Sequence, residues 1–380
     1  MTGDESSSGS TTVQAPHVAV VGGGAVGTTA AAHLAERGAS VTVFERSTVG
    51  DGSTGRAAGL AYDAFADPLT ARHAADALTT FRDLGGEVAF HEVPYVWVAT
   101  EAGDRAEAIR ANAGRMADQG RAVELVDPAD LRAEFPQVDT SDVVTAAVAR
   151  NAGCLDPAAY ADAMADRARA AGATIRDGVE VRVRADPPRV LTDDGEVPVD
   201  AVLVAAGAQT GPLLDDAALP SPVQAYRVQA LSASGPAVPM LFDATSEFYV
   251  RPTRRGLIAG DGTEPSPADP DDWERSADDA FVQDAMASLD AWLINYEGSP
   301  TEAWAGLCTA TPDGDPLLGP VAPGVIVAAG WHGHGVLRAP ASGRAAADAV
   351  LDGAVIDRFD PWRFDGDPGP FEIRTGSEEW

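Results

Sequence analysis

Lysine is absent from this sequence, and all 27 of its basic residues are arginine. A lysine Schiff base, on which pyridoxal-dependent enzymes rely, is therefore excluded. Cysteine is also scarce, because only Cys154 and Cys308 occur and they lie far apart in the chain. Two isolated cysteines exclude a disulfide scaffold and a cysteine-based zinc site. No apolar stretch approaches the roughly 20 residues that span a bilayer, so membrane insertion is not expected.

Positive charge is scarce relative to negative charge. The 58 acidic residues outweigh the 27 basic ones and give a formal net charge of −31. Such a surface repels nucleic acid and anionic lipid, so neither is an expected partner. Concentrated salt would screen the repulsion among carboxylates, and we interpret the composition as that of a halophile protein. GC-rich coding is an alternative that explains the missing lysine but not the excess of acid.

The amino terminus lacks the features of a secretion signal. Residues 1–16 are rich in Ser, Thr and Gly, with no basic start and no apolar core. We expect a disordered tail on a cytoplasmic protein. Since 380 residues exceed one average core, two domains are expected.

Hydrophobic patterns after the tail alternate between α/β segments and mixed segments. His17–Gly22 and Ser40–Glu45 are predicted strands that flank a predicted helix at Gly24–Arg37. Asp156 and Pro157 form a helix-start signal, with the helix continuing to Ala171. The other predicted elements are strands at 93–100, 174–176, 179–183, 201–205 and 325–330, strand-like segments over 226–261, helices at 104–119, 276–294 and 339–351, a mixed region over 61–151 and a linker at 265–272.

This alternation predicts an α/β fold with a discontinuous, Rossmann-type nucleotide-binding domain. A second, α+β domain built on a mostly antiparallel sheet would be inserted into it twice. The nucleotide-binding domain is assigned residues 17–62, 151–222 and 305–355. The inserted domain is assigned residues 63–150 and 223–304, and residues 356–380 form a C-terminal extension.

The first strand–helix turn carries a dinucleotide-binding pattern. Gly22, Gly24 and Gly27 form GxGxxG, in which the glycines permit a tight turn, close approach of a pyrophosphate and close helix packing. Glu45 ends the second strand about 20 residues later, where a carboxylate accepts ribose hydroxyls. The pattern favours a dinucleotide over a chance glycine turn but does not distinguish FAD from NAD.

Later segments distinguish the two cofactors. They are GDGSTGRAAGL (50–60), VDAVLVAAGAQT (199–210), FYVRPTRRGLIAGD (248–261) and the C-terminal stretches 304–321 and 325–348. With them, the chain resembles the D-amino-acid oxidase and sarcosine oxidase family of flavoproteins over nearly all of its length after the tail. The resemblance implies bound FAD and oxidation of the C–N bond of an amino acid or secondary amine, by hydride transfer to the flavin N5 atom.

The resemblance also implies which residues contact FAD. The helix expected from Ala339 would direct its positive end toward the flavin and stabilise negative charge on the reduced ring. By residue type alone, Val181 is a core valine and GHG is a glycine-rich turn. The implied FAD contacts are Gly22, Gly24, Ala25, Val26, Gly27, Glu45, Arg46, Ser53, Thr54, Ala57, Ala58, Gly59, Val181, Ala206, Gly207, Gly330, Gly333, His334, Gly335, Val336 and Leu337.

The expected substrate site departs from the family pattern. Amino-acid oxidases carry an arginine anchor where this chain has Cys308, and sarcosine oxidases carry a lysine where it has Leu337. We predict that Arg251 or His332 replaces this carboxylate anchor and that Tyr249 lies beside the substrate. The alternatives are a structural ion pair for Arg251 and a solvent-facing side chain for His332. For Cys308, a small buried hydrophobe is favoured over a covalent flavin link.

The lysine that sarcosine oxidases use in their reaction with oxygen would fall near Ile258, and this chain has none. We therefore expect a better dehydrogenase than oxidase. One alternative is an FAD-dependent 2-hydroxy-acid dehydrogenase with His332 as the base. Another is a non-catalytic FAD subunit of a larger dehydrogenase.

Overall fold

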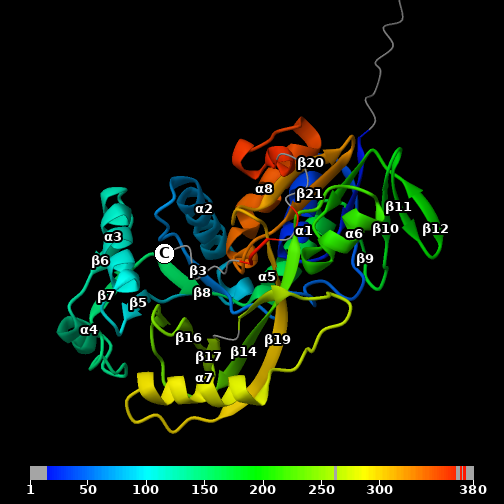
Figure 1. Cartoon of the computed structure of the whole chain (residues 1–380). Helices are drawn as coiled ribbons and strands as arrows, with labels where there is room; N and C mark the ends of the chain where they lie inside the picture. Colours follow the sequence, from blue (N-terminus) through cyan, green and yellow to red (C-terminus); the bar gives the residue numbers. More distant parts are fainter. Residues whose placement is uncertain (1–14, 261–262, 365–368, 370, 374–380) are drawn as a thin grey trace, which may run out of the picture.

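A computed structural model describes residues 15–260, 263–364, 369 and 371–373 (Figure 1). Most of the predicted tail, much of the C-terminal extension and Asp261 lie outside these residues. None of the helices in the described ranges combines the length and apolar character needed to cross a bilayer.

Six of the described strands form a mostly parallel sheet in the order β20-β21-β13-β1-β2-β9. Alternate residues of β1 enter two different cores: Val18 and Val20 pack under the helices, whereas Ala19 and Val21 pack on the opposite side. Burial on both faces explains why the central strands, over residues 17–21, 201–204 and 325–329, are almost wholly apolar. The strands are β1 His17–Val21, β2 Ser40–Phe44, β9 Thr174–Arg176, β13 Ala201–Val204, β20 Leu317–Ala322 and β21 Val325–Ala329.

Helices cover one face of this sheet and a small β-sheet with a short helix lies over the other (Figure 1). On the first face lie α1 Ala25–Glu36, α5 Pro157–Ala170 and α8 Gly335–Asp352, with α2 Pro68–Leu84 packed against α8. On the second lie β10 Arg182–Ala185, β11 Pro188–Thr192, β12 Gly195–Pro198 and α6 Thr210–Asp216, which follows the 3-10 turn η2 Gly207–Gln209.

Nine described strands form a second, mostly antiparallel sheet. Helix α7 (Asp279–Trp292) lies along its outer face, where it covers Val96, Val250 and their neighbours (Figure 1). Tyr95 and Trp97 alternate to the inner face, where they join the core that also packs beneath the helices of the first sheet. The strands are β5 Tyr95–Ala99, β6 Val123–Leu125, β7 Thr145–Ala149, β14 Gln224–Ala233, β15 Met240–Asp243, β16 Phe248–Thr253, β17 Gly256–Gly260, β18 Glu264–Pro267 and β19 Pro300–Ala310.

The remaining elements connect or flank the two large sheets. A three-stranded sheet in the order β3-β8-β4 links them. The bounds are β3 Leu60–Tyr62, β4 His91–Glu92, β8 Ala152–Cys154, α3 Asp104–Asp118, α4 Pro128–Glu134 and the 3-10 turns η1 Gly85–Val88, η3 Asp357–Phe359 and η4 Pro361–Arg363.

The fold class agrees with the sequence-based prediction, and several element boundaries do not. The strand predicted at 179–183 begins only at Arg182, and the linker predicted at 265–272 starts with residues of β18, which pairs with β14. Helix α8 begins at Gly335 instead of Ala339. Proline is common in a first helical turn, but Pro340 lies inside α8, which runs through it and gives up one hydrogen bond.

The longest helix that was not predicted from the sequence is α2, which lies within the region expected to be mixed, residues 61–151. Asp67 caps this helix by accepting from the Thr70 amide at 2.8 Å, and Pro68 follows it. The same Asp-Pro signal at Asp156 identified α5 correctly, where the carboxylate accepts from two amides at 3.0 and 3.1 Å. The signal for α2 was therefore present in the sequence.

Candidate FAD and substrate site

The glycine turn between β1 and α1 has no room for side chains. Gly22 has a φ of +111°, and a Cβ there would lie 2.4 Å from the carbonyl oxygen of Ala205. A Cβ on Gly27 would lie 2.0 Å from the carbonyl oxygen of Gly22. Glycine at these positions lets β1, β13 and the start of α1 approach one another closely.

The N-terminus of α1 is open to an anion. The Ala25 amide donates to Thr54 Oγ1 at 3.0 Å, and the first intrahelical bond runs from the Thr28 amide to the Gly24 carbonyl at 2.9 Å. Helix geometry then leaves the amides of Val26 and Gly27 without an intrahelical acceptor. These groups and the helix dipole favour a phosphate at this end.

The half-buried carboxylate of Glu45 is fixed where β2 ends. It accepts hydrogen bonds from the Gly23 amide at 2.8 Å and from the Ser47 amide at 2.9 Å. The neighbouring Arg46 is exposed and forms a 3.3 Å ion pair with Asp271. Glu45 thus stands at the mouth of the glycine turn, the position predicted for the ribose contact.

The loop over residues 50–60 lies between β2 of the parallel sheet and β3 of the three-stranded sheet. Ser53 Oγ donates to the Leu307 carbonyl at 2.6 Å, and Trp304 Nε1 donates to the Arg56 carbonyl at 3.0 Å, so β19 holds the loop. The next residues, Ala57 and Ala58, are partly buried. At Gly59, φ is +71° and a Cβ would lie 2.3 Å from the Leu155 carbonyl oxygen. The anchoring role of the Trp304 side chain was not predicted from the sequence.

Two other predicted FAD contacts have different surroundings. Ala206 and Gly207 follow β13, and a Cβ on Gly207 would lie 3.9 Å from Ser53 Oγ, so this turn reaches the same loop. Val181 is buried with Phe44 and Val183 in the core beneath the parallel sheet. That is the surrounding expected of a core valine.

The turn between β21 and α8, residues 330–335, has an unusual backbone. Gly330, His332 and Gly333 all have positive φ, at +83°, +47° and +84°. The Gly330 amide donates to Thr309 Oγ1 at 3.2 Å. Gly335 begins α8. The next two residues, Val336 and Leu337, are buried in the core between the parallel sheet and its helices.

His332 is buried, so the alternative of a solvent-facing side chain is wrong: its relative exposure is 3%. Its Nε2 atom accepts from the Thr311 amide at 2.9 Å. A backbone amide only donates, so this bond requires the lone pair of Nε2 and places the proton of the neutral ring on Nδ1.

His334 joins an aromatic cluster formed with Tyr62, Phe65, Tyr95 and Trp97. Its Nε2 atom lies 3.0 Å from the Tyr62 hydroxyl, and the rings of Tyr62 and Phe65 are stacked with centroids 4.9 Å apart. Burial lowers the pKa of His334 to about 3, and the positive charge of Arg338 adds to this effect. The ring is therefore neutral at physiological pH.

Tyr249 and Arg251 lie on the inner face of the second sheet. They alternate along β16 with Val250, which packs beneath α7 on the other face. The ring of Tyr249 lies over Gly260, where a Cβ would come within 2.4 Å of it.

Arg251 has a relative exposure of only 6%. Its Nη1 atom donates to the Pro252 carbonyl at 3.1 Å, and its Nε atom has no acceptor. No carboxylate in the described part of the chain lies within 4.0 Å of the guanidinium, so the structural ion pair considered from the sequence does not form there. The nearby Cys154 thiol stays neutral, because burial raises its pKa to about 11 although Arg251 opposes this.

Comparison with known proteins decides which cofactor this site serves. The model of the family of FAD dependent oxidoreductases (DAO) matches residues 17–349. The chain belongs to this family. It is 26% identical to a glycine oxidase from Bacillus licheniformis over 354 residues, which cover 88% of this chain and 93% of the relative.

Solved structures give the same fold. L-proline dehydrogenase from P. horikoshii superposes with a TM-score of 0.81 at 25% identity, over 93% of this chain and 98% of that one. Glycine oxidase from Geobacillus kaustophilus superposes with a TM-score of 0.83 at 22% identity, over 92% and 100%.

The cofactor of this FAD-dependent oxidoreductase is FAD, and the residues present fit it. The glycine turn has no side chains that would block a pyrophosphate, and Glu45 places a carboxylate beside this turn, where the sequence predicts a ribose contact. Cys308 lies opposite Tyr226 in the sheet, and burial raises the pKa of its thiol to about 11. The residue is partly exposed, so the small buried hydrophobe favoured from the sequence fits it only in part.

Proposed function

We propose that the enzyme oxidises the C–N bond of an amino acid or secondary amine and that Arg251 binds the substrate's carboxylate. The observation that carries this proposal is the buried guanidinium of Arg251, which has no carboxylate partner among the described residues. A buried cation without a counter-ion is costly, and a two-point bond to a carboxylate would offset that cost. The glycine oxidases and L-proline dehydrogenase described above have amino-acid substrates by name.

The surroundings of Arg251 suit a neutral amine. Bound FAD would supply the two-electron acceptor for the hydride that leaves the carbon beside the amine nitrogen. The aromatic cluster around Tyr62 and Trp97 excludes water and disfavours the protonated amine. Tyr249 shares the inner face with Arg251 and would orient the substrate next to its anchored carboxylate. The N-terminal turn of α8 would stabilise negative charge on the reduced cofactor.

The occupied Nε2 atom of His332 argues against the 2-hydroxy-acid alternative. That chemistry needs a base for the hydroxyl proton, and the lone pair of this ring is already engaged by the Thr311 amide at 2.9 Å. Removal of a hydride from a neutral amine requires no such base. A non-catalytic FAD subunit remains the second alternative, and the presence of a fitting anion anchor argues against it.

The first test uses purified enzyme with its FAD, under anaerobic conditions. Glycine, sarcosine, D-alanine, L-alanine and L-proline are added one at a time, with glycolate and lactate as hydroxy-acid counterparts. Loss of the long-wavelength flavin absorption with at least one amine supports the proposal. Bleaching by hydroxy acids alone would favour the first alternative, and no bleaching with any compound would favour the non-catalytic one.

A second test examines the anchor. Arg251→Met should raise the dissociation constant of the bleaching substrate about 100-fold, because truncation of a buried charge partner costs several kcal/mol. Binding of the matching amine without a carboxylate should change little. Arg255→Ala is the charge-matched control, since Arg255 is exposed on the turn that follows β16. Equal losses for both ligands would contradict the assignment of Arg251 to the carboxylate.

A further inference from the structure

The segment after α8, residues 354–364, forms a strap across β20. It begins after Gly353, whose φ of +65° ends the helix, and contains η3 and η4. Pro361 packs against Gly319, where a Cβ would lie 2.9 Å from it, and Trp362 Nε1 donates to the Pro320 carbonyl at 2.9 Å. The strap therefore lies beside the loop over residues 311–316, which precedes β20.

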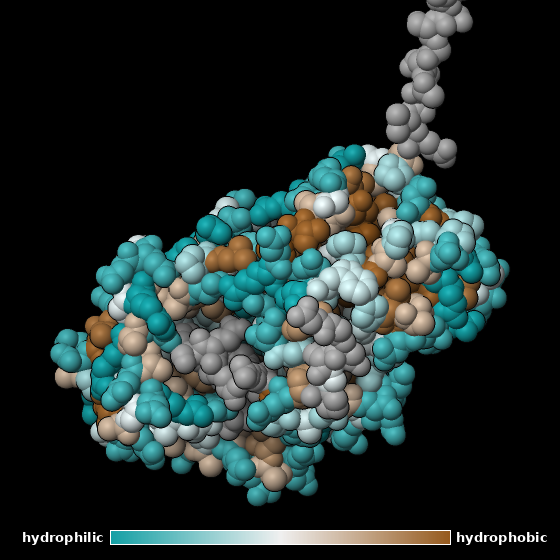
Figure 2. Space-filling model, turned by 45° about the horizontal axis from the view of Figure 1, so that its top comes forward, coloured by the Kyte–Doolittle hydropathy of each residue, from teal (hydrophilic) through white to brown (hydrophobic). Residues whose placement is uncertain are grey.

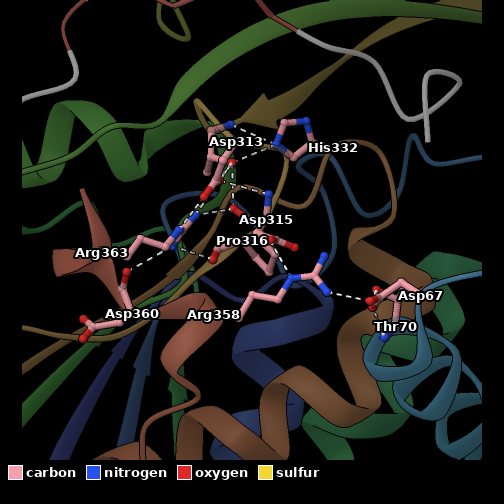
Figure 3. Close-up of polar contacts among 10 residues, drawn as sticks. Asp67, Thr70, Asp313, Asp315, Pro316, His332, Arg358, Asp360 and Arg363 are labelled. Carbon is pink, nitrogen blue, oxygen red and sulfur yellow. Dashed lines mark hydrogen bonds and ion pairs between the residues drawn. The ribbon is translucent and has the colours of Figure 1, made fainter. Parts of the chain in front are cut away.

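Arg363 connects the strap to this loop (Figure 3). Its guanidinium makes a two-point bond to the Asp313 carboxylate at 2.7 and 2.8 Å. It also donates to the carbonyls of Asp315 at 2.7 Å and Pro316 at 3.1 Å, and its side chain is only 12% exposed. Burial of the Asp313 carboxyl opposes ionisation, but Arg363 holds its pKa below the usual value. The pair is therefore charged at neutral pH.

Arg358 makes a second connection from the strap. Its Nε atom donates to the Asp315 carboxylate at 2.6 Å, and its Nη1 atom donates to the Asp67 carboxylate at 2.7 Å (Figure 3). Asp67 is the residue that caps α2, and α2 packs against α8. The loop is thus joined through the strap to the helix beside the cofactor turn.

The loop over residues 311–316 also holds the turn over residues 330–335, which follows β21. The Thr311 amide donates to His332 Nε2 at 2.9 Å, while Thr311 Oγ1 donates to the Asp315 carbonyl at 2.6 Å. The His332 amide donates to the Thr309 carbonyl at 2.9 Å. A positive φ at a non-glycine residue such as His332 persists only where its surroundings enforce it.

We propose that Arg363, supported by Arg358, is a positioning residue for the flavin end of the cofactor site. The strap fixes the loop, the loop fixes the ring and backbone of His332, and His332 fixes the turn from which α8 begins. Without Arg363, the loop over residues 311–316 loses four hydrogen bonds. The turn over residues 330–335 then loses the support that keeps its backbone in place. The consequence lies in cofactor affinity and in the electrostatics at the flavin, before any amine binds.

The test compares Arg363→Ala and Arg363→Lys with Arg344→Ala. Arg344 is the control arginine because it joins α8 to Asp76 of α2 at 2.8 Å and makes no hydrogen bond or ion pair with the loop among the described residues. The dissociation constant of FAD is measured from the fluorescence of FAD released on dilution of each holoenzyme. The affinity for sulfite, which adds to oxidised flavin and leaves negative charge on the ring, is measured by loss of the flavin band.

Both Arg363 variants should bind FAD about tenfold more weakly, and sulfite more weakly too, because charge-assisted bonds that fix the turn are lost. Arg363→Lys keeps the positive charge but loses the planar guanidinium that makes several hydrogen bonds at once. Its FAD and sulfite constants should therefore resemble those of Arg363→Ala, if the geometry of these bonds positions the turn. The Arg344→Ala variant should match the wild type in both constants. A folded Arg363→Ala enzyme with wild-type FAD and sulfite constants, whatever its melting temperature, would overturn the proposal. These readouts use no amine substrate, so the outcome is independent of the proposed function.

Discussion

Arg251 on β16 is paired directly with Ile258 on β17. Directly opposite residues of an antiparallel pair place their side chains on the same face, so Ile258 lies on the inner face with Tyr249. The resemblance to sarcosine oxidases puts their oxygen-reactive lysine near Ile258. The cation directly opposite that position in the sheet is Arg251, and a substrate carboxylate bound there would neutralise it.

We therefore expect the substrate-reduced enzyme to react slowly with oxygen and faster with an artificial dye. A fixed positive charge stabilises the superoxide-like state through which oxygen reacts, and Ile258→Lys should raise the rate of reoxidation by oxygen at least about tenfold. Because Arg251 disfavours a second cation beside it, the gain should be larger at pH 7 than at pH 9. Ile258→Met is the uncharged control. Rapid mixing of bleached enzyme with air-saturated buffer measures the rate, and wild-type reoxidation by oxygen that matches the dye would contradict the expectation.

Salt should stabilise this protein strongly. Its formal net charge is −31, and the face shown in Figure 2 is mostly hydrophilic. Dilution from molar to about 10 mM salt lengthens the Debye length from about 3 Å to about 30 Å, which strengthens repulsion among carboxylates. The melting temperature should therefore fall on dilution and recover when salt is restored. Equal melting temperatures in molar and dilute salt would refute the halophile interpretation.

Acid should destabilise the fold through His334. The pKa of this residue is about 3 in the folded protein, below the ordinary value of 6.5, so the unfolded chain binds the proton more tightly. Stability from this group is present above pH 6.5 and is lost as the pH falls toward 3, by at most about 1.4 kcal/mol per pH unit. Relative to His334→Asn, the wild type should lose free energy of unfolding between pH 7 and pH 5. Chemical denaturation at constant ionic strength measures the free energy of unfolding of both proteins against pH. The two profiles would be parallel if the pKa of His334 were the same in the folded and unfolded states.

The Gly27→Ala substitution should empty the cofactor site. The new Cβ would lie 2.0 Å from the Gly22 carbonyl oxygen, so the turn must open and its amides lose their alignment. The purified variant should carry far less FAD per chain than the wild type, as measured by absorbance after denaturation. Gly114→Ala is the control: nothing lies within 4 Å of a Cβ at this position of α3, and alanine suits a helix better. Full FAD content in Gly27→Ala would show that the turn tolerates a side chain.

Local patterns in the sequence determined the cofactor turn and the first α/β unit. The spacing of Gly22, Gly24 and Gly27 alone predicts the turn, because a tight turn and a closely packed helix exclude side chains at fixed positions. The Asp156-Pro157 pair likewise located the start of α5, since helix capping is completed within a few residues. The fold class followed from the alternation of α/β and mixed segments, and the family followed from several short segments in order.

Only the tertiary structure decided the states of Arg251, His332 and His334. Whether a guanidinium finds a carboxylate depends on residues brought from other strands, and in a chain with 58 acidic residues the sequence favoured neither outcome for Arg251. The tautomer of His332 depends on the Thr311 amide, 21 positions away, and the neutral state of His334 depends on burial among rings from other elements. Burial and long-range hydrogen bonds set charge and orientation, and neither is a property of the neighbouring sequence.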